Sequence, residues 1–445
     1  MKKVLVIGAG RSASSLIRFL INESEQLDWH IKVVDQDGNL AQERVNNHPN
    51  TSHSSFNAND ESQRNELIQW ADLVISMLPA SFHVLVAKDC IRHKKHILTP
   101  SYISDEMRDL DQEARAQGVL SLNELGVDPG IDHMSAMKEL DEIRAKGGVI
   151  TGFESFTGGL LSPETEKENP WKYKFTWNPR NVVVAGQGGA VKFIQEGTYK
   201  YIPYHKLFRR TEFIDIEGYG TFEGYANRDS LKYRKTYGLE DVKTIYRGTL
   251  RRKGFSRAWD AFVQLGATDD SYTIENSEHM TYREFINLFL AYNPTDSVEL
   301  KLMHYLKLDQ DDTLMDKLKW LDLFSDKKIG LKNASPAQIL EHILKQKWTL
   351  EEEDRDMIVM WHKFIYELKG ETHERQSHMI SIGEAQPFTA MSNTVGLPVG
   401  IAAKMVLTGA INEVGVHLPV HPEFYNPILD ELEKYGIEFK VTDIS

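Results

Sequence analysis

The chain has 445 residues, too many for one simple hydrophobic core, so two or three domains are expected. Its 52 lysines and arginines stand against 65 acidic residues, and this net charge of −13 argues against nucleic acid as a partner. No apolar run long enough to cross a membrane is evident, and the single cysteine, Cys90, excludes an internal disulfide or a zinc ribbon. We therefore expect a cytoplasmic enzyme that binds neither a membrane nor nucleic acid.

The first 130 residues alternate between strand-like and helix-like segments. The strand candidates are residues 3–7, 30–34, 73–77, 95–98 and 119–122. Helix candidates lie between them at residues 12–22, 80–93 and 105–117. Such alternation predicts a parallel sheet built from right-handed βαβ units, which makes this an α/β protein with an N-terminal Rossmann domain over residues 1–129.

The pattern changes after residue 130. Strand-like pieces recur at residues 149–157, 190–194, 212–216, 243–250 and 378–383, separated by turns. They indicate a mixed α/β domain over residues 130–280 and 369–394. Residues 281–368 look mostly helical and charged, which predicts a helical insert, and an apolar helix is expected at residues 398–409.

Residues 8–13 (GAGRSA) fit the dinucleotide-binding fingerprint G-x-G-x-x-G/A between a strand and a helix. Gly8 allows the tight turn, Gly10 lets the pyrophosphate approach the backbone, and Ala13 lets helix and sheet pack closely. The N–H groups of Ala9, Arg11 and Ser12 would then face the phosphates, as is usual at a helix start. The alternative is a glycine turn that binds no dinucleotide.

Asp35 closes the second strand, where a carboxylate can bind the ribose hydroxyls of the cofactor. A carboxylate would repel a 2′-phosphate, so Asp35 favours NAD, although the nearby cations Arg11 and Lys32 keep NADP open. Asp35 could also be an ordinary turn residue. Leu78 and Pro79 follow the strand at residues 73–77 and are further expected cofactor contacts.

Seven segments together resemble the saccharopine reductase family, the glutamate-forming saccharopine dehydrogenases, from end to end. They are residues 101–104 (SYIS), 123–133 (NELGVDPGIDH), 158–160 (GGL), 173–177 (YKFTW), 227–230 (NRDS), 247–251 (RGTLR) and 394–398 (TVGLP). One departure is Thr157, which stands where family members often have cysteine. The resemblance implies a homodimer and a C-terminal segment, residues 395–445, that returns to the Rossmann domain.

The resemblance also implies the reaction. Such enzymes are NAD(P)-dependent oxidoreductases acting on CH–NH donors, in lysine metabolism. They interconvert saccharopine with glutamate and 2-aminoadipate 6-semialdehyde through an imine. The alternatives are a carboxynorspermidine-type dehydrogenase, whose polyamine substrate would need fewer arginines, and a cofactor-binding protein without turnover.

Saccharopine carries three carboxylates, which arginine binds well because its planar guanidinium can grip a carboxylate with two hydrogen bonds. Arg228 and Arg251 lie in matching motifs and are the expected carboxylate partners; each could instead form an ordinary salt bridge. The remaining substrate contacts implied by the resemblance are Ser101, Tyr102, Asp128, Trp177, Thr249 and Leu250.

Asp128 and Tyr102 are the candidates for catalysis. Asp128 follows a predicted strand end, where ligands bind in parallel sheets, and it could pair with the substrate ammonium or move a proton. It could equally cap the turn before Pro129. Tyr102 could donate a hydrogen bond to a carboxylate or pack on the nicotinamide, and His133 is a weaker candidate base. No histidine spacing typical of a metal site is present.

Overall fold

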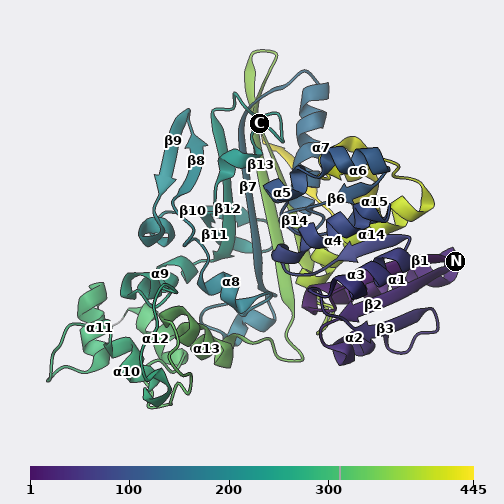
Figure 1. Cartoon of the computed structure of the whole chain (residues 1–445). Coiled ribbons are helices and arrows are strands. Elements are labelled where there is room, and N and C mark those ends of the chain that lie inside the picture. The colour runs from purple at the N-terminus through teal and green to yellow at the C-terminus, as the bar shows by residue number, and fades with distance from the viewer. Residues whose placement is uncertain (310–311, 445) are drawn as a thin grey trace. The chain divides into compact units, whose positions relative to one another are not determined.

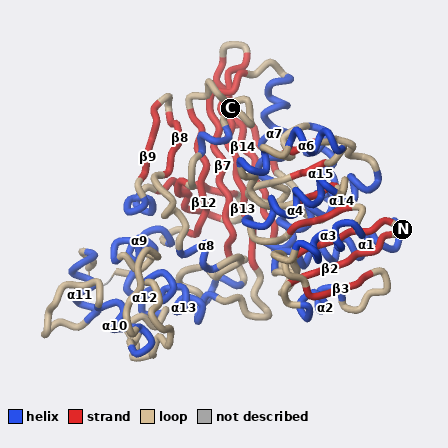
Figure 2. The backbone as a smooth tube through the Cα atoms, viewed as in Figure 1, coloured by secondary structure: helices blue, strands red, loops and turns tan. Residues whose placement is uncertain are grey.

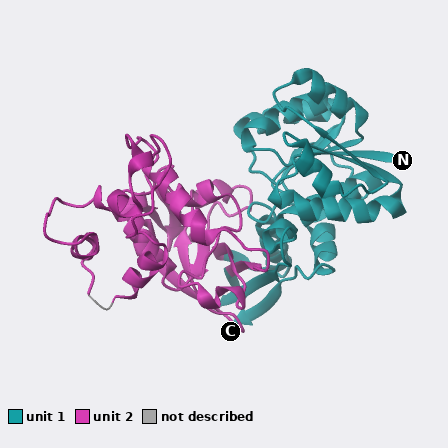
Figure 3. Cartoon of the chain, turned by 90° about the horizontal axis from the view of Figure 1, so that it is seen from below, with its two compact units in different colours: residues 1–150, 364–445 teal, residues 151–363 magenta. Residues whose placement is uncertain are grey.

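The computed structural model describes residues 1–309 and 312–444, which fold as two compact units (Figure 3). Unit 1 comprises Met1–Ile150 and Phe364–Ser445, and unit 2 comprises Thr151–Lys363. The predicted division had placed residues 130–150 and 369–394 in the second domain, whereas their packing groups them with the Rossmann strands. One reason is a hydrogen bond that the phenol of Tyr425, in the C-terminal segment, donates to Asp141 at 2.8 Å.

Unit 1 is built on a sheet of seven parallel strands in the order β15-β6-β5-β4-β1-β2-β3. Its edge strand β3 lies beside β2 in Figures 1 and 2. The strands are β1 (Lys2–Ile7), β2 (Trp29–Asp35), β3 (Thr51–Ser55), β4 (Leu73–Ser76), β5 (His96–Leu98), β6 (Leu120–Leu122) and β15 (Gly415–His417). The order of the first six is that of a Rossmann domain, which confirms the predicted fold. The chain reverses direction across the sheet between β1 and β4, where such folds bind their ligands.

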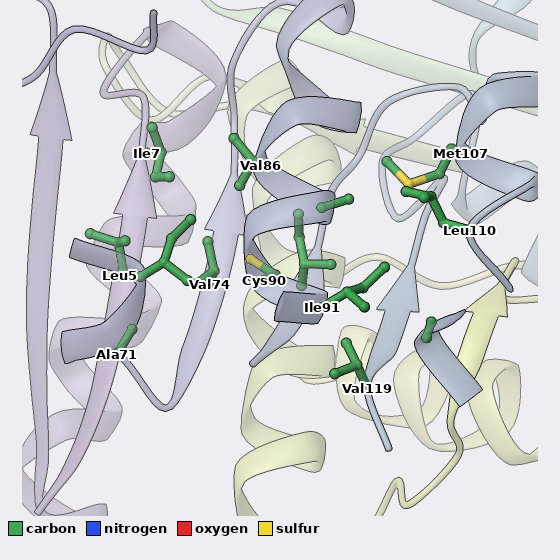
Figure 4. Packing of buried hydrophobic residues seen from close by; sticks show 14 of the residues in the cluster. Leu5, Ile7, Ala71, Val74, Val86, Cys90, Ile91, Met107, Leu110 and Val119 are labelled. Carbon is green, nitrogen blue, oxygen red and sulfur yellow. The ribbon is translucent and has the colours of Figure 1, made fainter. Parts of the chain in front are cut away.

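Helices of unit 1 connect and cover these strands. They are α1 (Ser14–Leu27), α2 (Gly38–Val45), α3 (Glu61–Trp70), α4 (Ala80–Arg92), α5 (Asp105–Arg108), α6 (Asp111–Gln117), α7 (Ile131–Ala145), α14 (Ala390–Thr408) and α15 (Pro422–Glu433), with a 3₁₀ turn at Arg11–Ala13. Leu5, Val74 and Ile91 belong to the core between sheet and helices (Figure 4). Cys90 lies in this core, and burial raises the pKa of its thiol. Unit 1 also holds an antiparallel pair, β14 (Glu371–Ile382) and β16 (Lys440–Ile444).

Helix α14 begins eight residues before the predicted start at Pro398, because Thr389 caps it by accepting a hydrogen bond from the N–H of Ser392 at 3.0 Å. Pro398 therefore lies inside the helix. By length and composition α14 is the one described helix that could cross a membrane, a feature the sequence analysis missed, and 61% of its apolar window is buried inside the protein. It packs against α1 through Gly396.

Unit 2 contains a mixed sheet in the order β10-β11-β12-β7-β13. Its strands are β7 (Val149–Leu161), β10 (Thr211–Ile216), β11 (Gly220–Ala226), β12 (Thr244–Arg252) and β13 (Asp356–Leu368), of which β7 begins and β13 ends in unit 1. Strand β12 pairs parallel with β7 and antiparallel with β11. A hairpin of β8 (Val191–Gln195) and β9 (Thr198–Ile202) joins β12 through β8.

Unit 2 has six helices among its described residues, and two of them, α9 (Phe255–Leu265) and α13 (Pro336–Trp348), supply rings to a cluster of buried aromatic side chains. The other four are α8 (Pro179–Val183), α10 (Tyr282–Asn287), α11 (Val298–Leu306) and α12 (Thr313–Trp320), with 3₁₀ turns at Thr165–Glu168, Tyr204–Arg209, Ser230–Tyr233 and Ser277–His279. The cluster centres on Trp348, whose ring lies 5.2 Å from Trp171 and 5.0 Å from Tyr173.

The prediction that helix continues to residue 368 is wrong, because β13 occupies Asp356–Leu368. The run of Ile, Val, Trp, Phe and Tyr in that segment favours a strand.

Candidate functional site

The glycine loop lies between β1 and α1, at the point where the strand order of the sheet changes direction. Gly8 has φ +106°, and a Cβ there would lie 2.9 Å from the carbonyl oxygen of Met77, so only glycine fits. Gly10 caps the turn formed by Arg11, Ser12 and Ala13, and α1 begins two residues later than predicted, at Ser14. Ala13 is buried, as a close helix–sheet contact requires.

Asp35 ends β2 and contacts the glycine loop directly. Its Oδ2 accepts a hydrogen bond from the N–H of Ala9 at 2.7 Å, and its Oδ1 accepts one from Asp37 at 3.0 Å. Arg44 of α2 reaches the same loop, where its Nε donates to the Ala9 carbonyl at 3.3 Å. The sequence analysis did not single out Arg44; a cation in the helix that follows β2 was the available signal.

The segments that follow β4 and β5 contribute the next group of residues. Leu78 and Pro79 follow β4, and Pro79 is the N-cap residue of α4. Ser101 follows β5, and its hydroxyl lies 2.7 Å from Nε2 of His83. The other ring nitrogen of His83, Nδ1, lies 2.9 Å from the hydroxyl of Ser76 at the end of β4. His83 was missed by the sequence analysis.

Tyr102 and Asp128 form a hydrogen-bonded pair within unit 1. The phenol of Tyr102 donates to Oδ1 of Asp128 at 3.0 Å, and both side chains are half-buried. Residues 126–130 close on themselves, because Gly126 donates its N–H to the carbonyl of Pro129 at 2.8 Å. Gly130 has φ +148°, and a Cβ there would collide with Gly126. This closed turn fixes Asp128 next to Tyr102.

His133, the weaker candidate base, is fully buried. Its Nε2 lies 2.6 Å from Oε2 of Glu124, and Oε1 of Glu124 accepts the N–H of Ile103 at 2.9 Å. His133 therefore holds Glu124, which in turn holds the backbone of Ile103, next to Tyr102. This environment favours a structural role for His133 over that of a base.

Arg251 of β12 is a buried cation of unit 2. Only 6% of the residue is exposed, and its guanidinium lies over the ring of Tyr173 at 4.9 Å. One terminal nitrogen donates to the carbonyl of Leu250 at 2.8 Å, whereas Nε has no hydrogen-bond partner among the residues the structure describes. Glu223 is paired with Arg251 in the β11–β12 register, but its oxygens accept the N–H groups of Gly254 and Ser256.

The other predicted substrate residues of unit 2 lie in different surroundings. Arg228 follows β11, has φ +51° and is exposed. Trp177, just before α8, is 37% exposed. Thr249 is half-buried and Leu250 fully buried on β12. Thr157 of β7 has a buried hydroxyl without a hydrogen-bond partner within the described part of the chain. The described residues contain no group of three or more His, Cys, Asp or Glu side chains arranged for a metal ion.

Two family models match the chain over most of its length. The model for the saccharopine dehydrogenase NADP binding domain matches residues 4–122, and that for the saccharopine dehydrogenase C-terminal domain matches residues 126–437. The chain belongs to the saccharopine dehydrogenase family. The predicted family is therefore confirmed, and the protein is an oxidoreductase with a domain for a nicotinamide dinucleotide.

Relatives in this family align over nearly the whole chain. Saccharopine dehydrogenase [NADP(+), L-glutamate-forming] of Saccharomyces cerevisiae is 34% identical, with 99% of this chain and 98% of the relative covered. The protein of the same description from Schizosaccharomyces pombe is 32% identical over 99% and 98%. The rat mitochondrial alpha-aminoadipic semialdehyde synthase is 32% identical over 98% of this chain but 47% of its own length.

Solved structures agree with the family assignment. The apo saccharopine dehydrogenase (L-Glu forming) of S. cerevisiae matches with a TM-score of 0.91 at 32% identity, over all of both chains. A homospermidine synthase of Legionella pneumophila matches with a TM-score of 0.57 at 10% identity, which indicates a shared fold alone.

Proposed function

We propose that this member of the saccharopine dehydrogenase family oxidises L-saccharopine to L-glutamate and 2-aminoadipate 6-semialdehyde with NADP, and catalyses the reverse reaction. In the oxidative direction a hydride leaves the methylene carbon that joins the six-carbon arm to the secondary amine, and water then hydrolyses the resulting imine to the semialdehyde and glutamate. The bound nicotinamide supplies the hydride chemistry; the protein's own groups bind the substrate, orient it and move protons. The full-length relatives named for this reaction support the proposal.

The observation that carries the proposal is the buried guanidinium of Arg251. A buried cation is costly unless an anion compensates it, yet the described residues offer Arg251 no carboxylate within ion-pair distance. A carboxylate of saccharopine would provide the missing anion. Arg228, in the second matching motif, is the proposed partner of another substrate carboxylate.

Proton transfer is assigned to the pair formed by Tyr102 and Asp128. The carboxylate of Asp128 accepts a hydrogen bond from the Tyr102 phenol at 3.0 Å, and a carboxylate can accept a proton from a substrate N–H placed beside it. It can therefore accept the proton that the substrate amine releases and return it during imine hydrolysis. Ser101 and Trp177 complete the proposed substrate contacts.

NADP replaces NAD as the proposed preferred cofactor. Both oxygens of Asp35 accept backbone N–H groups, so this carboxylate helps to fix the glycine loop, whereas Arg44 places a guanidinium beside Ala9. A guanidinium there suits a 2′-phosphate. The matching family model, described as NADP binding, agrees.

Replacing Arg44 tests this cofactor preference. We expect Arg44→Ala to raise the Kd of NADP about tenfold or more and to leave that of NAD nearly unchanged, because only NADP carries the phosphate. Fluorescence titration of the unliganded protein with each dinucleotide measures both constants. Equal weakening of NAD and NADP would contradict a phosphate contact.

The activity itself is tested by following reduction of NADP with saccharopine as substrate. We expect turnover by the unaltered protein, and for Arg251→Met a rise in the KM of saccharopine of at least tenfold, because the substrate carboxylate loses its partner. Arg209→Met, at an exposed arginine paired with Asp260, is the matched control and should keep the KM. Turnover by the folded protein without any dependence on Arg251, or no turnover at all, would overturn the proposal.

A further inference from the structure

A buried histidine links the proposed substrate contact Ser101 to the end of β4. His83 lies near the start of α4, and only 4% of it is exposed. Its Nδ1 lies 2.9 Å from the Ser76 hydroxyl and its Nε2 lies 2.7 Å from the Ser101 hydroxyl. Both ring nitrogens are thus within hydrogen-bond distance of a serine.

Strand pairing and hydrogen bonds hold the backbone of Ser76 and Ser101, the two serines that contact His83. Ser76 pairs with Ile7 in the parallel register of β4 and β1, next to the glycine loop. Ser101 donates its N–H to the hydroxyl of Thr99 at 3.3 Å, and its carbonyl accepts the N–H of Glu124 at 3.2 Å. With its backbone fixed in this way, and its hydroxyl held within 2.7 Å of His83, Ser101 can still vary the direction of its O–H bond.

That direction depends on which ring nitrogen of His83 carries hydrogen. A neutral imidazole has one N–H donor and one acceptor nitrogen. If Nε2 carried no hydrogen, Ser101 would donate its hydroxyl hydrogen to the ring. If Nε2 carries the hydrogen, it donates to Ser101, whose O–H can then donate to a substrate carboxylate. Burial lowers the pKa of His83 to about 4, which keeps the ring neutral near pH 7.

We propose that His83 is a positioning residue, which donates from Nε2 to Ser101 and thereby directs the Ser101 hydroxyl toward a carboxylate of the substrate. In this arrangement Ser76 donates to Nδ1, so three hydrogen bonds run in one direction from the end of β4 to the substrate. Hydrogen bonds aligned in this way strengthen one another. The inference rests on the proposed function, because it takes Ser101 as a contact of saccharopine.

Two substitutions separate this role from a merely structural one. The amide of His83→Gln can occupy the place of Nε2 and donate to Ser101, whereas His83→Asn can replace only Nδ1 and leaves Ser101 without its donor. We expect His83→Asn to raise the KM of saccharopine about tenfold with kcat little changed, and His83→Gln to stay within about threefold of the unaltered protein. Equal effects of the two variants would overturn the inference.

Combining His83→Asn with Ser101→Ala tests whether His83 acts through Ser101. If His83 acts through Ser101, His83→Asn should add almost nothing to the KM of the Ser101→Ala variant, because interacting residues are not additive. A full additional rise would contradict the inference. The Kd of NADP should stay unchanged in every variant, and a large increase would indicate a general disturbance of the fold.

His96→Gln is the matched control, since His96 stands at the opposite end of β5 and accepts the N–H of Leu120 at 2.9 Å. It should leave the KM unchanged, and a rise equal to that of His83→Asn would overturn the inference.

A measurement without substrate keeps the inference distinct from the proposed function. Nuclear magnetic resonance of isotope-labelled ring nitrogens in the unliganded protein, assigned through His83→Gln, should find the hydrogen of His83 on Nε2. A hydrogen on Nδ1 would overturn the inference even if saccharopine is turned over. Absence of turnover together with a hydrogen on Nε2 would instead contradict the proposed function and the substrate that Ser101 is assigned to bind.

Discussion

Arg228 and Arg251 share a predicted role but lie in different surroundings, and the difference has consequences for mutation. Arg251 is buried against Tyr173, whereas Arg228 is exposed in the turn after β11. The left-handed backbone of Arg228, at φ +51°, is unusual for a residue with a Cβ. Such conformations often occur where function requires a particular side-chain direction.

We expect Arg228→Ala to raise the KM of saccharopine severalfold, because the proposed substrate carboxylate loses an exposed cation, and an exposed ion pair is worth up to about 1 kcal/mol. Steady-state kinetics at saturating NADP gives the value, and Arg209→Ala, at an exposed arginine outside the proposed site, is its control. An unaltered KM would remove Arg228 from the substrate site.

His83 also makes stability depend on pH. Its pKa is lowered from 6.5 to about 4 by burial, so below pH 6.5 the unfolded chain takes up a proton that the folded protein does not. The free energy of unfolding should therefore fall between pH 6.5 and pH 4, with a contribution of about 3 kcal/mol from this group.

Urea unfolding at several pH values measures this contribution. His83→Gln should lose about 3 kcal/mol less than the unaltered protein between pH 7 and pH 4, because it has no ring to protonate. His279→Gln, at a side chain that is 82% exposed, should keep the original pH dependence. Identical slopes for His83→Gln and the unaltered protein would refute the assignment.

Among single residues, the sequence predicted those whose role depends only on their neighbours along the chain. Gly8 and Ala13 follow from the steric needs of one turn, and both fill the expected places. His83 and Arg44 escaped prediction because their partners, Ser101 and Ala9, come from other strands or loops. Without the fold, neither residue differs from an ordinary polar residue of a helix.

Helices α14 and α1 of unit 1 pack tightly against each other, next to the glycine loop. A Cβ on Gly396 would lie 2.7 Å from the backbone nitrogen of Leu16, and one on Gly400 would lie 2.7 Å from the ring of Phe19. Glycine at these two positions lets α14 approach the start of α1, where the glycine loop ends.

We expect Gly396→Ala to destabilise the protein by about 1–3 kcal/mol, because the added methyl meets backbone that cannot move without shifting α1. Gly400→Ala should cost less, since its neighbour is a side chain. Urea unfolding measures both, and NADP titration should register a weaker Kd for Gly396→Ala. A neutral or stabilising effect of Gly396→Ala would contradict the packing argument.

Element prediction succeeded where apolar pattern and length agree. The buried strand at Leu73–Ser76 was found almost to the residue, because a run of apolar or small residues over positions 73–78 ends at Pro79. Strand β3 was missed because its sequence, TSHSS, is polar at the edge of the sheet. The apolar helix predicted from Pro398 begins at Ala390 instead, and Pro398 lies inside it.

For the whole molecule, the sequence predicted the class of fold and the family better than the division of the chain. Strand order in unit 1 follows from the alternation of strands and helices, together with the handedness of their connections. The grouping of α7 with unit 1 depends on its packing against α15 and on contacts such as that of Tyr425 with Asp141, which are 284 positions apart. Local patterns contain no trace of such a pairing.

The order of segments along the chain also sets the order in which the protein can fold during synthesis. Unit 1 opens with Met1–Ile150 and is completed by Phe364–Ser445, with all of unit 2 between them. A nascent chain therefore leaves the ribosome with β6 and α1 lacking β15 and α14, their later neighbours. Until residues 390–417 have been synthesised, the surfaces of β6 and α1 that β15 and α14 cover in the folded protein stay open to water.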